Sequence, residues 1–340
     1  MKVLVTGASG FLGGYVVPEL LAKGHEVVGL DNFSKYGEVA RSYDDDPAYT
    51  FVEGDAGDAG PLADLLADCD QLVAGAAMIG GIPYLHEFPY DVLASNERIT
   101  AASCDAAIRA FQNHALQKVT FISSSLVFER ATDWPSREGQ ELDIPPPRTT
   151  YGFQKLAVEY FARAARHQYG LPYTIVRPFN CVGAGEVRAI RSEEVLSGNV
   201  KLAMSHVVPD LVKKVLMGQD PVHILGDGSQ VRPFTYAGDF ARGLALAMES
   251  PRAMNEDFNI ASDQVTTVLE LATLIWTKIQ GPERAFRYKS DPPLEHDVQK
   301  RIPEVNKARK LLGFEATTSL DEMLDEVIPW IEDALTKGRV

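Results

Sequence analysis

The sequence predicts an α/β fold in which a doubly wound parallel sheet is joined by a smaller, mainly helical domain. Short apolar runs alternate with helical patterns from the first residues to Pro178, as expected for strands that helices cover on both faces. After Pro178 the alternation weakens, and residues 264–340 contain helical patterns with few strand-like runs. The first part is therefore expected to form the sheet, and the last part the second domain.

The predicted elements follow in chain order. The buried strands of the sheet are expected at residues 2–6, 26–30, 50–53, 71–75, 118–123 and 173–178. Helices are expected between them at residues 11–23, 61–67, 92–115 and 151–168. Strands and helices that alternate in this way give a parallel, doubly wound sheet. Further along the chain, we expect a helix at 207–217, a strand at 222–225, a turn at 226–230 and a helix at 235–249.

Composition narrows the class of protein. The chain has 340 residues, of which 45% are hydrophobic, and a net charge of −14. It can bury a large core, but its acidity argues against a general nucleic-acid or membrane-surface binder. No apolar run approaches the ~18 residues of a membrane span, so we expect a cytoplasmic protein. The cysteines Cys69, Cys104 and Cys181 lie far apart, which favours buried thiols and no metal site.

Three glycines follow the first predicted strand, in the stretch VTGASGFLGG. Gly7 permits a tight turn, Gly10 lets the backbone approach a pyrophosphate, and Gly13 lets the helix pack close to the strand. Taken alone, the glycines also fit an ordinary strand-to-helix turn. Asp31 ends the second strand, 18 residues after Gly13, where a carboxylate accepts hydrogen bonds from an adenosine ribose and repels a 2′-phosphate. Together they predict a Rossmann domain that binds NAD rather than NADP.

A second group of residues, Ser124, Tyr151 and Lys155, has the composition of a proton-transfer site. Tyr151 and Lys155 lie four residues apart in a predicted helix and therefore on one face of it. A nearby ammonium lowers the pKa of a phenol from its ordinary value of ~10, so that the phenolate can accept a hydroxyl proton. Ser124 ends a strand and could hold the same substrate oxygen. A chance match is the alternative for the Tyr–Lys spacing taken alone.

With these residues in view, the sequence resembles the extended short-chain dehydrogenase/reductase family, in its NAD-dependent nucleotide-sugar epimerase/dehydratase branch. The resemblance covers nearly the whole chain. It rests on the ordered segments VTGASGFLGG, LDNFS, EGDA, AGAAMIGG, FISSSLVF, YGFQK, VRPFNCVG and GDGSQVRPFTYAGD. It implies that Ser124, Tyr151 and Lys155 are the catalytic residues, that NAD is the cofactor, and that a nucleotide sugar is the substrate.

The resemblance also implies a larger set of binding residues. Those expected to bind NAD are Gly7, Gly10, Phe11, Leu12, Gly13, Asp31, Asn32, Asp55, Ala56, Ala76, Ala77, Asn96, Ser123, Tyr151, Lys155 and Pro178. Those expected to bind the nucleotide sugar are Ser124, Ser125, Asn180, Lys201, Arg232 and His86. A surface ion pair is the alternative for Arg232, a solvated loop for Lys201, and a packing role for His86.

Domain organisation and assembly follow from the same resemblance. Residues 1–180 and about 222–260 are expected to form the NAD-binding Rossmann domain. Residues 181–221 and 261–340 are expected to form the nucleotide-sugar-binding domain. The helices at 92–115 and 151–168 are expected to form a homodimer interface, since the second has an apolar face at helical spacing.

The residues after Ser124 narrow the reaction. Dehydratases and decarboxylases of this branch carry an acid there, whereas this chain has Ser125 and Leu126. Enzymes that invert C3 and C5 often have a cysteine at the Leu126 position, although AAMIGG resembles one of their segments. We therefore expect C4 inversion of a UDP-sugar through a transient 4-keto intermediate, with tightly bound NAD. An NAD(P)-dependent reductase, a C3/C5 epimerase and a dehydratase are the alternatives, and a non-catalytic NAD-binding protein is a lesser one.

Overall fold

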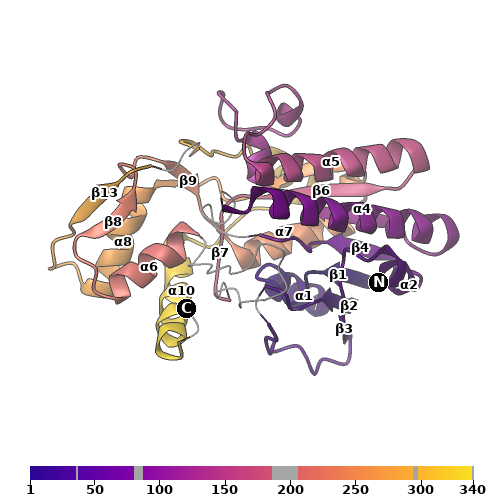
Figure 1. Cartoon of the computed structure of the whole chain (residues 1–340), viewed down its shortest axis with the longest axis horizontal. Coiled ribbons are helices and arrows are strands. Elements are labelled where there is room, and N and C mark those ends of the chain that lie inside the picture. The colour runs from indigo at the N-terminus through magenta and orange to yellow at the C-terminus, as the bar shows by residue number, and fades with distance from the viewer. Residues whose placement is uncertain (36, 80–86, 186–205, 294–297, 339–340) are drawn as a thin grey trace.

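The chain folds into two lobes, a larger one that contains the main sheet and a smaller one at the left of Figure 1. The computed structural model describes residues 1–35, 37–79, 87–185, 206–293 and 298–338. Among the helices of these residues, none combines the length and the hydropathy that a bilayer crossing requires.

The larger lobe is built on a parallel seven-stranded sheet with the order β11-β6-β5-β4-β1-β2-β3. Its strands are β1 (Lys2–Thr6), β2 (Glu26–Asp31), β3 (Tyr49–Glu53), β4 (Gln71–Ala74), β5 (Lys118–Ile122), β6 (Tyr173–Pro178) and β11 (Glu256–Ile260). The first six lie where the apolar runs predict them. The sequence analysis missed β11, which adds an edge strand beside β6.

Helices cover both faces of this sheet, which confirms the doubly wound fold. One face carries α1 (Gly13–Ala22), α7 (Ala237–Glu249) and α9 (Asn306–Leu312), whose apolar side chains share a core with β1 and β2. The other face carries α2 (Ala59–Leu66), α4 (Pro89–Asn113) and α5 (Thr150–Tyr169), whose apolar side chains share a second core with β4 and β5. Because all seven strands are parallel, their carboxyl ends meet at one edge of the sheet, where ligands bind in such folds.

The smaller lobe has its own apolar core, formed largely by α6 (Val207–Leu216), α8 (Val268–Gln280) and α10 (Leu320–Thr336). The described residues also form three two-stranded sheets. They pair β8 (Val222–Leu225) with β13 (Tyr288–Asp291), β9 (Val231–Pro233) with β12 (Val265–Thr267), and β7 (Cys181–Val182) with β10 (Thr235–Tyr236).

These pairings move the predicted domain boundaries. The strand at 222–225 was assigned to the Rossmann domain, but it pairs with β13, and its apolar side chains lie in the core of the smaller lobe. Conversely, α9 was assigned to the second domain, but Ala308 and Phe314 pack into the core shared by α1 and α7. Apolar patterning identifies each element but not the core that buries it.

One carboxylate links the two lobes. Glu326 of α10 accepts hydrogen bonds from the Tyr15 hydroxyl of α1 and from the Tyr236 hydroxyl of β10, both at 2.6 Å. It also accepts the N–H of Ala184 at 3.0 Å. The glycine-rich turn, the chain after β7 and the smaller lobe are therefore joined at Glu326.

Candidate active site

The glycine-rich turn is too closely packed for side chains. Gly7 has a φ of +75°, and a Cβ added to it would lie 3.0 Å from the main-chain nitrogen of Ala76. A Cβ added to Gly13 would collide with the carbonyl oxygens of Gly7 and Ala8. The N–H groups of Gly10 and Gly14 donate to the carbonyls of Gly7 and Gly10. The turn thus leads directly into α1, and the main-chain N–H groups at a helix start suit a phosphate. Those of Gly14, Tyr15 and Val16 donate to carbonyls of Gly10 and Leu12.

Asp31 lies at the end of β2, against this turn. Its carboxylate accepts the N–H of Ser9 at 3.0 Å and the N–H of Phe33 at 2.8 Å. Burial raises the pKa of Asp31, although these amide donors and the charge of Arg41 act in the opposite direction. The Asn32 main chain donates a further bond, but a carboxylate has about four acceptor sites, so the predicted bond to a ribose hydroxyl is compatible with these contacts.

The sequence analysis did not identify Arg41, which lies on the glycine turn. Its Nη2 donates to the carbonyl oxygens of Ser9 at 2.7 Å and Gly10 at 3.2 Å. No motif marked this arginine, because it belongs to the long connection between β2 and β3. It fixes the carbonyl side of the turn whose N–H side is predicted to bind phosphate.

Other residues predicted to bind NAD lie around the same edge. Asn32 donates a hydrogen bond to Asp55 at 3.3 Å. Ala56, the residue after Asp55, is buried. Ala76 lies against Gly7, and its N–H donates to the Thr6 hydroxyl at 3.1 Å. The remaining members are Phe11 and Leu12, which precede α1, Ala77, which follows Ala76 and is half-buried, and Pro178, which ends β6.

The side chains of Asn96 and Ser123 both form hydrogen bonds within the protein. Both ends of the buried Asn96 amide pair with the main chain of Met78, at 2.7 and 2.9 Å, so Asn96 braces the segment that follows β4. The Ser123 hydroxyl donates to Glu159 at 2.7 Å inside the protein.

The three predicted catalytic residues come together at the carboxyl end of β5. Thr149 caps α5 by accepting the N–H of Gly152, which starts the helix just before Tyr151. Lys155 is 4% exposed, and its ammonium donates to the Ile122 carbonyl at 2.9 Å. Its Nζ lies 5.9 Å from the centre of the Tyr151 ring. A hydrogen bond joins Tyr151 to Ser124, which is itself 8% exposed.

The net shift of the Tyr151 pKa is opposite to the lowering that was expected from Lys155. Burial raises the pKa of Tyr151 to about 12, and this outweighs the lowering effects of the Ser124 hydrogen bond and the Arg301 charge. Burial also lowers the pKa of Lys155 to about 8. Both groups are driven toward their neutral forms, because the low-polarity site disfavours charge on either of them. The cation that acts on the phenol is Arg301, which the sequence analysis did not consider.

A buried cluster of charged residues lies directly behind the catalytic residues. Arg177 of β6 is fully buried, and its Nε and Nη2 donate to the two oxygens of Glu159, each at 2.7 Å. Arg177 also pairs with Glu141 at 3.0 Å and with Asp257 of β11 at 2.7 Å. Since Glu159 accepts the Ser123 hydroxyl, this cluster connects α5 to the residue before Ser124.

The substrate side of the site is partly described. Asn180 has a φ of +42°; its Nδ2 donates to the Pro233 carbonyl at 3.0 Å, and its Oδ1 accepts from Arg301 at 3.2 Å. Arg232 is 7% exposed and donates to the carbonyls of Val231 and Gln299. Ser125 is buried in the 3₁₀ turn η1 (Ser125–Phe128). The predicted residues His86 and Lys201 lie outside the described residues.

Comparison with known proteins identifies the family. Residues 3–261 match the NAD dependent epimerase/dehydratase family. The chain belongs to this family. A UDP-glucose 4-epimerase of Mycolicibacterium smegmatis is 27% identical over 347 residues, which cover 98% of this chain and 99% of that protein. Other relatives, each 26% identical, are a dTDP-4-dehydro-6-deoxy-D-allose reductase of Streptomyces and a uronate decarboxylase of Bacillus cytotoxicus.

Solved structures agree with this family assignment. The UDP-glucose 4-epimerase of Thermotoga maritima with UDP-glucose is 28% identical, with a TM-score of 0.80 and coverage of 98% of this chain and 100% of that one. The UDP-glucuronic acid 4-epimerase of Bacillus cereus, solved with UDP-glucuronic acid and NAD, is 25% identical, with a TM-score of 0.81 and coverage of 98% and 99%. NAD is the cofactor of this family, and the glycine turn with Asp31 fits it.

Proposed function

We propose that this member of the family is a nucleotide-sugar C4 epimerase, with a UDP-sugar as substrate and NAD kept in place between turnovers. The observation that carries the proposal is the composition of the site around Tyr151. Ser124, Tyr151 and Lys155 lie together, whereas the next two residues after Ser124 are a buried serine and Leu126. Neither Ser125 nor Leu126 can serve as the acid or base that loss of water or carbon dioxide requires.

The residues of the site support a separate role for each of them in catalysis. Tyr151 would accept the proton of the sugar 4-hydroxyl, and Ser124 would hold the same oxygen through its own hydroxyl. Bound NAD, held by the glycine turn and Asp31, would supply a reversible acceptor for the C4 hydride. Lys155, held by the Ile122 carbonyl, and Arg301 would provide the positive charge that a Tyr151 phenolate needs in a buried site.

The test is turnover of UDP-sugars by the purified chain without added NAD, followed by proton NMR. We expect C4 inversion, and we expect Tyr151→Phe to reduce its rate by about 10²–10⁴-fold, the contribution of a positioned proton acceptor. NAD content should be unchanged in that variant. Tyr288→Phe is a control, because Tyr288 lies on β13 of the smaller lobe and is 44% exposed.

Other outcomes would assign a different function. Stoichiometric consumption of NADH or NADPH, without inversion in its absence, would identify a reductase. Bound NAD with no turnover of any UDP-sugar would identify a non-catalytic NAD-binding protein. The predicted homodimer through α4 and α5 remains part of the proposal, and it is supported by the exposed Phe153 (46%) and Tyr160 (57%) on α5.

A further inference from the structure

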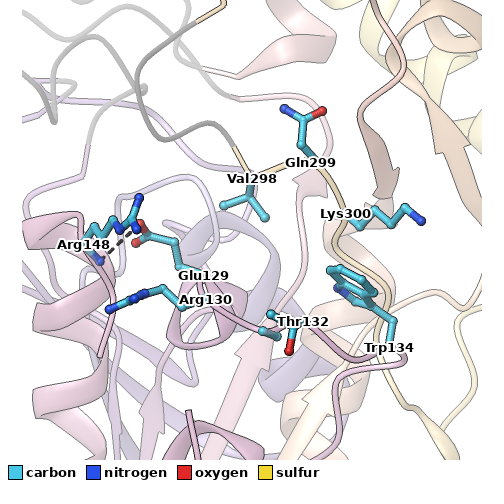
Figure 2. A pocket seen from close by; sticks show the side chains of 9 residues that line it. Glu129, Arg130, Thr132, Trp134, Arg148, Val298, Gln299 and Lys300 are labelled. Atoms are coloured by element: carbon cyan, nitrogen blue, oxygen red, sulfur yellow. Dashed lines mark hydrogen bonds between the residues drawn. The ribbon is translucent and has the colours of Figure 1, made fainter. Parts of the chain in front are cut away.

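A cavity of about 400 Å³ is lined by residues 129–132, 134, 148 and 298–300 (Figure 2). Arg130, Arg148 and Lys300 contribute three cations to its lining, and Glu129 contributes one carboxylate. Trp134 forms part of one wall, and the Lys300 ammonium lies 5.4 Å from the centre of its ring. The lining therefore carries more positive than negative side chains, whereas the chain as a whole has a net charge of −14.

Each wall of the cavity contains residues that are linked to Tyr151 through a neighbouring residue. On one wall, Glu129 accepts the Thr149 hydroxyl at 2.7 Å, and Thr149 caps α5 two residues before Tyr151. The opposite wall consists of residues 298–300, which directly precede Arg301. Arg301 contacts Asn180, and its charge acts on the Tyr151 phenol. The cavity walls therefore adjoin, along the chain, the residues that position Tyr151.

Glu129 offsets one of the three positive charges in the cavity lining. The two oxygens of that carboxylate accept the main-chain N–H groups of Arg148 and Thr149 as well as the Thr149 hydroxyl. Arg130 is half-buried and forms no ion pair with a carboxylate in the part of the chain that the structure describes. Arg130 and Arg148 extend on the same side of the cavity in Figure 2, whereas Lys300 lies over Trp134 on the other side.

We propose that this cavity binds a carboxylate carried by the sugar, as in a nucleotide-linked hexuronic acid, and that Arg130 pairs with it. This inference rests on the proposed function, because it places the sugar against Tyr151. In a hexuronic acid the carboxylate is attached to C5, the neighbour of the reacting C4. A group in that position would reach the cavity while the 4-hydroxyl stays at Tyr151 and Ser124. Guanidinium groups pair with carboxylates through short, charge-assisted hydrogen bonds.

The experiment compares two ligands that differ only at C6, UDP-glucuronic acid and UDP-glucose. Their affinities for the purified, NAD-containing protein are measured by titration calorimetry, with UDP as the reference. We expect UDP-glucuronic acid to bind at least about tenfold more tightly, the effect of one hydrogen bond between charged groups. Arg130→Gln should remove this preference and change UDP-glucose binding less than about twofold. Arg130→Lys should keep part of the preference, and Arg252→Gln, at an exposed arginine, should keep all of it.

The outcomes separate this inference from the proposed function. Equal affinity for the two sugars in the wild-type protein, or an unchanged preference in a folded Arg130→Gln variant, would overturn the carboxylate site. Turnover is followed in parallel by proton NMR. C4 inversion without a preference for the uronate would leave the epimerase intact and reject the inference. A preference for the uronate without inversion would support the inference and reject the epimerase.

Discussion

The two parts of the sheet edge that form the candidate site are held in place by different forces. The cofactor part, β1–α1–β2, depends on main-chain atoms that approach closely around Gly7 and Gly13. The catalytic part, β5–α5–β6, depends on charged side chains buried around Arg177. Close packing of glycines is encoded by local spacing, whereas the ion cluster gathers residues that lie far apart in the chain. The two parts should therefore respond differently to substitution.

The largest effect is expected in the catalytic part, for Glu159→Gln. Glu159 is fully buried and accepts from Ser123, Arg163 and both nitrogens of Arg177. Removing one partner from a buried ion pair leaves an uncompensated charge, so the free energy of unfolding should fall by about 3–5 kcal/mol. Urea denaturation measures this change.

The control for this variant is Glu332→Gln, which removes the same charge from an exposed position of α10. It should change the free energy of unfolding by less than about 0.5 kcal/mol. If Glu159→Gln cost less than about 1 kcal/mol, then Glu141 and Asp257 would suffice to hold Arg177, and the contrast between the two parts would be lost.

In the cofactor part, Gly13→Ala should lower the free energy of unfolding by about 3 kcal/mol, the upper range for a side chain forced into a packed region. The added Cβ would collide with two carbonyl oxygens of the turn. Displacement of the turn should also reduce the NAD that is retained on purification, which an enzymatic NAD assay measures. Gly60→Ala is the control, because a Cβ there is in ordinary contact with Asp58 alone. A Gly13→Ala variant that is stable and keeps its NAD would contradict the packing argument.

The smallest effect concerns Asp257, and it depends on pH. Burial acts to raise the pKa of Asp257, but the charges and hydrogen bonds of Arg177 and Lys307 lower it to about 2, from an ordinary value of 3.8. The carboxylate therefore stabilises the fold above pH ~4 by about 2 kcal/mol, and this contribution is lost as the pH falls toward 2. Asp257→Asn should be less stable than the wild type by that amount at pH 7.

Urea denaturation between pH 7 and pH 3 tests this dependence. The difference between the wild type and Asp257→Asn should narrow below pH 4. Asp325→Asn serves as the control, since Asp325 is 67% exposed and its ion pair with Lys278 should contribute less than about 1 kcal/mol at any pH. A constant difference across this pH range would show that Asp257 acts through packing and not through its charge.

The contrast between local spacing and distant contacts also explains which parts of the site could be predicted from the sequence. Gly7, Gly13, Asp31, Tyr151 and Lys155 belong to local patterns, and the structure places them at one edge of the sheet as expected. The roles assigned to them in binding and catalysis remain predictions. Local spacing is informative here because a turn or one helix face fixes the relative positions of residues that are close in sequence.

What the sequence did not reveal depends on distant contacts. The strand β11 begins with Glu256 and Asp257, so it lacks the apolar run of a buried strand, and its second acid is accommodated by Arg177 of β6. Arg41 and Arg301 reach the site from connections without a recognisable motif. The raised pKa of Tyr151 depends on burial by residues from several parts of the chain, which no spacing between Tyr151 and Lys155 could indicate.

The hydrogen bonds of Glu326 bear on how long a bound dinucleotide would remain. Tyr15, in the first turn of α1, and Tyr236, the residue before α7, share this single carboxylate of the smaller lobe. If the lobes must part before the dinucleotide can leave, each departure breaks at least the Tyr15 bond, so its dissociation rate would be slow compared with the catalytic cycle. Slow exchange would not reduce the turnover rate of an enzyme that regenerates its own oxidant within every cycle. It would limit the turnover rate of an enzyme that must replace its reductant in every cycle.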